Sequence, residues 1–158
     1  MTIRRNVKRA IISTAFVVGV AVGGRAADPG APVSVERNPM LTPGAILTTS
    51  KSTICRSGYS DTVRDVSEKT KDEVFARYGL VRPRYMLGRY EVDHWVPLSL
   101  GGSNDITNLY PMAAPEYKRK DVVEVAALRA VCKGELGLSE AQFMIANDWR
   151  ALGERLGK

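Results

Sequence analysis

An aspartate and the only histidine of the chain stand next to each other, at Asp93 and His94. An unperturbed imidazole titrates near neutral pH, so His94 is suited to act as a general base. An aspartate oxygen is a ligand that hard divalent cations accept. Asn108 follows His94 by fourteen residues, and its amide can bond to backbone groups and hold a loop in place. These side chain types together could transfer a proton beside a bound cation.

The segment around this pair predicts a strand, a loop and a return strand. Residues 90–98 are rich in β-branched and aromatic side chains, residues 101–105 carry a dense turn signal, and the chain returns near Leu109. On a regular strand Asp93 and His94 point to opposite faces. If both serve one site, the strand must bend or end there.

Three helices are expected around this segment. The first covers about 66–78, where Asp65 and Glu68 have capping-box spacing and Gly79 ends the apolar period. The second begins near Pro115 and ends at Gly134, and the third opens at Ser139.

The composition fits one ordinary globular domain. Of 158 residues, 44% are hydrophobic and 25% are charged, which excludes a disordered or collagen-like chain. The formal net charge is +6, but five of the 23 Lys and Arg residues lie in the first 26 residues, which contain no acid. The remainder carries 18 basic and 17 acidic residues, a net charge of +1. The total charge is therefore weak evidence for a polyanionic partner.

The amino terminus has the pattern of a secretory signal peptide. Basic residues within 4–9 precede an apolar, small-residue run over 10–24. This run is short for a membrane span, which needs about 20 residues. We expect residues 1–26 to be a cleaved signal peptide, residues 27–50 an extended arm or linker, and residues 51–158 the folded domain. The mature protein would then be periplasmic or extracellular with no integral membrane domain; an uncleaved anchor is the alternative.

The chain has two cysteines, Cys55 and Cys132. Thiols in an oxidising compartment tend to pair, so export predicts a disulfide between them. Two unpaired buried cysteines are the alternative. With one His and two Cys, a zinc site of four Cys or His ligands is excluded.

Residues 91–111 resemble the HNH endonucleases, whose ββα-metal motif places an Asp-His pair at the end of the first strand and an Asn in the return region. His94 and Asn108 have the spacing of that family, and Gly101 and Gly102 fall where its loop turns. More loosely, most of the chain is similar to small exported bacterial HNH-type proteins. The resemblance implies an α+β fold, a ββα-metal unit with additional flanking helices, and divalent-metal-dependent hydrolysis of DNA, with RNA as a second substrate class.

The resemblance also implies roles for single residues. His94 would be the catalytic base that activates water, Asn108 the loop organiser of the catalytic site, and Asp93 one metal ligand. The family usually has His or Asn at its third position, where this sequence has Glu116. Asp93 and Glu116 would bind one ion, Mg²⁺ or Mn²⁺. Glu116 as a favourable acid in the first helical turn is the alternative, and Asp121 is the next candidate ligand.

Two basic segments flank the motif and could bind phosphates without reading sequence. The predicted nucleic-acid contacts are Arg84, Arg89, Lys118, Arg119 and Lys120. A solvated mixed surface is the alternative for these residues. Two rival functions remain open at this point: a non-catalytic nucleic-acid-binding module on a degenerate HNH scaffold, and an envelope protein with a structural role.

Overall fold

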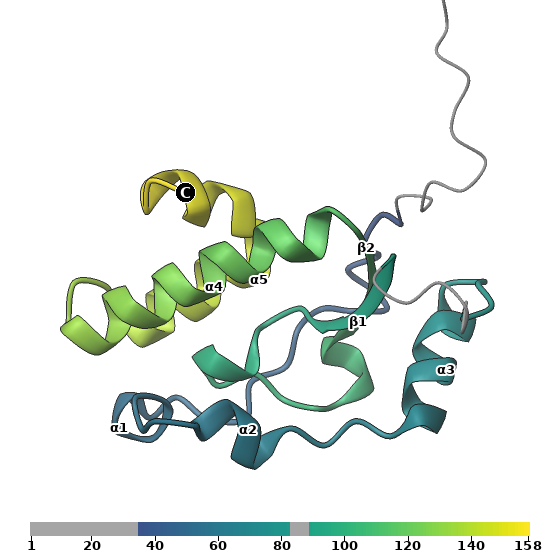
Figure 1. Cartoon of the computed structure of the whole chain (residues 1–158), viewed down its shortest axis with the longest axis horizontal. Helices are drawn as coiled ribbons and strands as arrows, with labels where there is room; N and C mark the ends of the chain where they lie inside the picture. The colour runs from purple at the N-terminus through teal and green to yellow at the C-terminus, as the bar shows by residue number, and fades with distance from the viewer. Residues whose placement is uncertain (1–34, 83–88) are drawn as a thin grey trace, which may run out of the picture.

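The computed structural model describes residues 35–82 and 89–158 and combines helices with one small antiparallel sheet (Figure 1). The expected signal peptide, residues 1–26, and the first part of the expected arm lie outside the described residues. The elements in chain order are α1 (Lys51–Ile54), α2 (Tyr59–Val63), α3 (Glu68–Arg77), β1 (Tyr90–His94), β2 (Leu109–Ala113), α4 (Glu116–Lys133) and α5 (Leu138–Arg155). This mixture of helix and strand confirms the α+β class.

The two strands form the predicted hairpin-like pair. β1 and β2 are antiparallel, and Asp93 is opposite Tyr110 while His94 is opposite Leu109. The connection between them contains two short 3₁₀ turns, Leu98–Leu100 and Ile106–Asn108. Every residue of β2 is buried, because α3 and α4 both pack against this strand.

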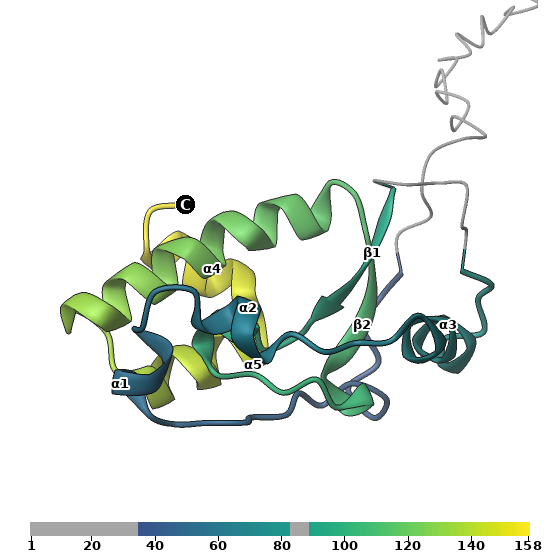
Figure 2. The ribbon, with the colours of Figure 1, turned by 60° about the horizontal axis from the view of Figure 1, so that its bottom comes forward.

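Much of the core lies between α4 and α5, which run side by side in both views (Figures 1 and 2). Each helix places small and branched residues at intervals of three and four on its inner face. The buried residues of this interface include Val123, Ala127, Val131, Ala141, Ile145 and Leu152. α4 ends at Gly134 as predicted, with the glycine at φ 82° in the left-handed region. α5 is interrupted at Asp148, whose carboxylate accepts hydrogen bonds from the backbone N–H groups of Arg150 and Ala151.

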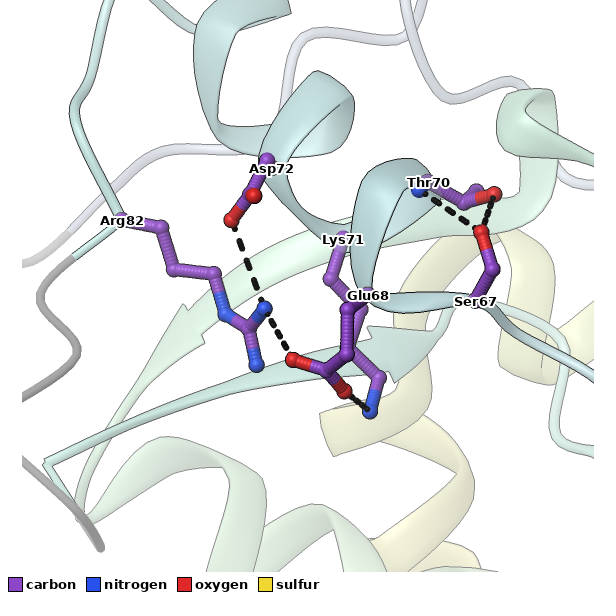
Figure 3. Close-up of polar contacts among 6 residues, drawn as sticks. All are labelled: Ser67, Glu68, Thr70, Lys71, Asp72 and Arg82. Atoms are coloured by element: carbon purple, nitrogen blue, oxygen red, sulfur yellow. Dashed lines mark hydrogen bonds and ion pairs between the residues drawn. The ribbon is translucent and has the colours of Figure 1, made fainter.

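α3 begins later than the sequence predicts, because Ser67 is the residue that caps it. The Ser67 hydroxyl accepts a hydrogen bond from the Thr70 backbone N–H at 3.0 Å. Glu68 then bonds Lys71 at 2.7 Å and Arg82 at 2.6 Å (Figure 3). These two cations lower the pKa of the exposed Glu68 carboxyl to about 2.

The described part of the expected arm, residues 35–50, lies against the loop that joins the strands. Ile46 forms an isolated antiparallel bridge with Gly102, and the backbone N–H groups of Leu47 and Thr48 donate to the Gly101 carbonyl. A Cβ on Gly102 would collide with the Val96 carbonyl, so the close approach of two backbones requires glycine here.

Cys55 and Cys132 have their sulfur atoms 1.97 Å apart, at the distance of a disulfide bond, as the sequence predicts. The pair joins the end of α1 to the last turn of α4. In the parts of the chain that the structure describes, no helix combines the length and the apolar character that crossing a bilayer requires.

Candidate functional site

A cavity of about 260 Å³ lies where the end of β1 meets α4 and the end of α2. Asp93 and His94 both line it, so the two neighbouring residues reach one cavity. Most of its other lining side chains are polar or charged. They include Ser60, Arg64, Glu91, Ser99, Asp121 and Glu124.

His94 is 4% exposed, and its Nε2 lies 2.9 Å from the Asn104 side-chain oxygen. The Asn104 amide nitrogen in turn donates to the Val63 carbonyl at 2.6 Å. This second bond orients the amide so that its oxygen faces the ring; Nε2 then carries the proton and Nδ1 carries the lone pair. Burial lowers the pKa of His94, although the bond to Asn104 opposes the shift. A neutral imidazole at physiological pH follows.

Lys120 connects the helix to the end of the strand. It is fully buried, and its Nζ lies 2.8 Å from Asp93 Oδ2, 2.5 Å from Glu124 Oε1 and 2.8 Å from the His94 carbonyl oxygen. Burial alone would lower the pKa of this ammonium, but the Asp93 and Glu124 carboxylates raise it instead. Lys120 therefore stays charged and fixes the positions of both Asp93 and the backbone of His94.

The other carboxylates of the cavity are crowded. Partial burial raises the pKa of Glu91 and of Asp121, and repulsion from Asp93 adds to the shift in both cases. Burial also raises the pKa of Glu124 to about 7, against the attraction of Lys120. Among the residues described, no three His, Cys, Asp or Glu side chains converge to hold a metal ion.

Asn108 holds the loop between the strands, as the sequence predicts. Its buried amide nitrogen donates to the Val96 carbonyl at 2.9 Å and the Ser103 carbonyl at 2.8 Å. Its side-chain oxygen accepts from the backbone N–H groups of Val96 at 2.9 Å and Ala45 at 3.2 Å. All four bonds go to backbone groups, so Asn108 organises the loop that begins directly after His94.

Glu116 does not join Asp93, contrary to the expected ligand pair. It lines a different cavity with Trp95, Tyr110 and Arg150, and its carboxylate is paired with Arg119 and Arg150. The reason is helical geometry: five residues of α-helix separate Glu116 from Asp121 by about 140° around the axis. Asp121 is the acid of α4 that lies in the cavity with Asp93.

The expected phosphate contacts are dispersed. Lys120 is a correction, because a fully buried ammonium held by two carboxylates cannot reach a phosphate. Arg84 lies outside the described residues. Arg89, Lys118 and Arg119 do not line the His94 cavity.

Sequence reasoning missed several other residues of the cavity, among them Glu91, Ser99 and Arg64. Glu91 stands two residues before Asp93, so the period of a strand already places both on one face. Ser99 has a buried hydroxyl with no hydrogen-bond partner in the described ranges. Arg64 lies 30 residues before His94, and no local pattern in the sequence indicates that α2 brings it here.

Comparisons of the chain with protein-family models, with curated proteins and with solved structures find no match.

Proposed function

We propose that this protein is an exported, divalent-metal-dependent endonuclease of the HNH type that hydrolyses phosphodiester bonds of DNA, with RNA as a second substrate class. The observation that carries the proposal is the position of the His94 imidazole, which Asn104 holds in a cavity lined by carboxylates; burial also lowers its pKa, which favours the neutral ring that a base requires. The order of strand, loop, strand and helix around it supports the resemblance to the ββα-metal motif.

In this proposal His94 is the general base. With Nε2 donating to Asn104, the Nδ1 lone pair would take a proton from water as the water oxygen bonds to phosphorus and the bond from phosphorus to the leaving sugar oxygen breaks. Asn108 and Lys120 are positioning residues, because the first holds the following loop and the second holds the His94 carbonyl.

The donor set of the cavity fits a hard cation. Asp93 and Asp121 supply only carboxylate oxygens. The two carboxylates repel each other, and a bound cation would reduce this repulsion. In this proposal Asp93 and Asp121 would hold Mg²⁺ or Mn²⁺, with water and phosphate oxygens as its other ligands. When bound, such an ion would neutralise charge on the phosphate and the leaving oxygen.

A non-catalytic nucleic-acid-binding module is the second candidate function. The observation that favours it is the Lys120 ammonium on Asp93, because a divalent ion must share this carboxylate with a cation that is already present. Binding of nucleic acid without cleavage under any divalent ion would establish this candidate.

Cleavage of supercoiled plasmid by the refolded mature chain, with Mg²⁺, Mn²⁺ or chelator, tests the proposal. We expect His94→Ala to reduce the rate by roughly 10²–10⁴-fold, without changing the metal concentration for half-maximal rate. Asp121→Asn should raise that concentration, because it removes a ligand. Glu116→Gln is the matched control and should leave it unchanged. Cleavage that persists in chelator, or in His94→Ala at the wild-type rate, would refute the assignment.

Export is part of the proposal, and the pairing of Cys55 with Cys132 supports it. We expect the mature protein to start at Ala27 or Asp28. Intact-mass analysis of the protein from the envelope fraction measures this, and retention of Met1 there would contradict signal cleavage.

A further inference from the structure

A second cavity, of about 360 Å³, adjoins the His94 cavity. The two cavities share the lining residues Ser60, from α2, and Leu128, from α4, so they adjoin along these helices, and we treat them together as one groove. The groove runs from His94 to Cys55 and Cys132, which line its far end. Figure 1 shows α1 and α2 on the same side of α4.

Three exposed arginines line this groove. Arg64 lies at the His94 end, whereas Arg56 and Arg129 lie at the disulfide end. Within the described ranges none of the three makes an ion pair. The Arg56 guanidinium donates to the Thr53 carbonyl at 3.4 Å. Their guanidinium groups are therefore available for an external anion.

The two ends of the groove differ in charge. The His94 end holds four carboxylates against two cations, Arg64 in the lining and the buried Lys120 on Asp93 and Glu124, so this end attracts a phosphate poorly without a divalent cation. The disulfide end holds Arg56 and Arg129 against Asp61 alone among charged residues. Affinity for a polyanion must therefore arise mainly at the disulfide end. The disulfide joins the residue before Arg56 to the helix that carries Arg129, so it fixes the spacing of the two cations.

We infer that this groove binds the backbone of a nucleic-acid strand, with Arg56 and Arg129 holding phosphates beyond the cleavage site and Arg64 holding the phosphate beside His94. The inference rests on the proposed function for the identity of the anion. An arginine guanidinium forms paired, charge-assisted hydrogen bonds to phosphate, and such contacts carry no base specificity.

Fluorescence anisotropy of a labelled single-stranded DNA oligonucleotide, in chelator to prevent cleavage, tests the groove. We expect the double variant Arg56→Gln/Arg129→Gln to weaken binding by about tenfold or more. It should also reduce the slope of log affinity against log salt by about 1.4, since each single-strand phosphate contact contributes about 0.7. The matched control Lys69→Gln/Lys158→Gln removes the same charge at two exposed residues that line neither cavity, and it should change affinity by less than about twofold. Unchanged thermal unfolding establishes that each variant is folded.

Equal losses in the two double variants would overturn the inference, because they would indicate a general effect of charge. So would unchanged binding in the groove variant, or a wild-type chain that binds an acidic peptide in place of DNA or RNA. A wild-type chain that binds through these arginines but never cuts would refute the nuclease and leave the groove intact. A chain that cuts plasmid normally with Arg56 and Arg129 replaced would refute the groove and leave the nuclease intact.

Discussion

Replacing Asn108 by alanine should destabilise the fold more than any single hydrogen bond would suggest. The side chain is fully buried and makes four hydrogen bonds to the backbone. Two of them satisfy the N–H and the carbonyl of Val96, itself 1% exposed. Alanine would leave these two groups without a partner in a place that water reaches poorly.

The magnitude follows from burial. A buried backbone group left without a partner costs about 1–3 kcal/mol, and a bond that water can replace contributes nearer 0.5 kcal/mol. With two groups of the first kind, and with Ser103 and Ala45 as groups of the second kind, we expect a loss of about 3–7 kcal/mol. That is a large part of the 5–15 kcal/mol by which domains are typically stable.

Equilibrium urea unfolding, followed by the fluorescence of buried Trp95 and Trp149, measures this loss. Asn147→Ala is the matched control, because Asn147 is exposed on α5 and bonds only the Phe143 carbonyl. It should change the free energy of unfolding by less than about 0.5 kcal/mol. A loss below about 1 kcal/mol in Asn108→Ala would show that backbone contacts alone hold the loop, and would refute the reasoning.

Three further predictions concern charge and covalent structure. Lys120→Met should lower the free energy of unfolding by about 3–5 kcal/mol at pH 8, because it leaves buried carboxylates unpaired. The loss should be smaller at pH 5, where Glu124 is protonated because its pKa is raised. Lys118→Met, at an exposed lysine of the same helix, is the control. Burial lowers the pKa of His94 below its usual 6.5, so the folded state binds this proton at a lower pH than the unfolded state does. Stability should therefore fall as the pH falls below 6.5. NMR titration of this imidazole measures the direction, and a midpoint above 6.5 would contradict it. Reducing the Cys55–Cys132 disulfide should lower the free energy of unfolding by at most about 4.5 kcal/mol from loop entropy. Thermal unfolding with and without reductant measures this loss, and two free thiols in the unfolded, unreduced protein would exclude the bond.

The sequence predicts the central elements well because their signals are local. The turn between the strands depends on Gly101 and Gly102, and the end of α4 depends on Gly134. The start of α3 is wrong by two residues. Asp65 and Ser67 are both residue types that cap helices. The hydrogen bond from the Thr70 N–H to the Ser67 hydroxyl identifies Ser67 as the cap.

Lys120 is the most informative error in the site. It stands in a run of three basic residues, which is typical of a solvated surface. Yet Tyr117, Lys120, Val123 and Ala127 recur at intervals of three and four and form the buried face of α4. The helical period of the apolar residues therefore indicates that Lys120 lies on the buried face of α4. A buried lysine in turn requires acidic partners. Arg64 is a different case, because only tertiary packing of α2 brings it to the cavity.

The arrangement at the end of β1 resolves the difficulty that adjacent strand residues point to opposite faces. β1 ends at His94 and the chain bends at Trp95 and Val96, so His94 is the last residue held by the ladder. Lys120 binds the Asp93 carboxylate and the His94 carbonyl at 2.8 Å each. One ammonium thus fixes the side chain of one residue and the backbone of the next. The His94 ring is positioned separately, by Asn104. The buried Lys120, which cannot touch substrate, therefore sets the distance between the candidate ligand Asp93 and the candidate base His94. A folded variant without this ammonium should keep both side chains but lose their fixed spacing.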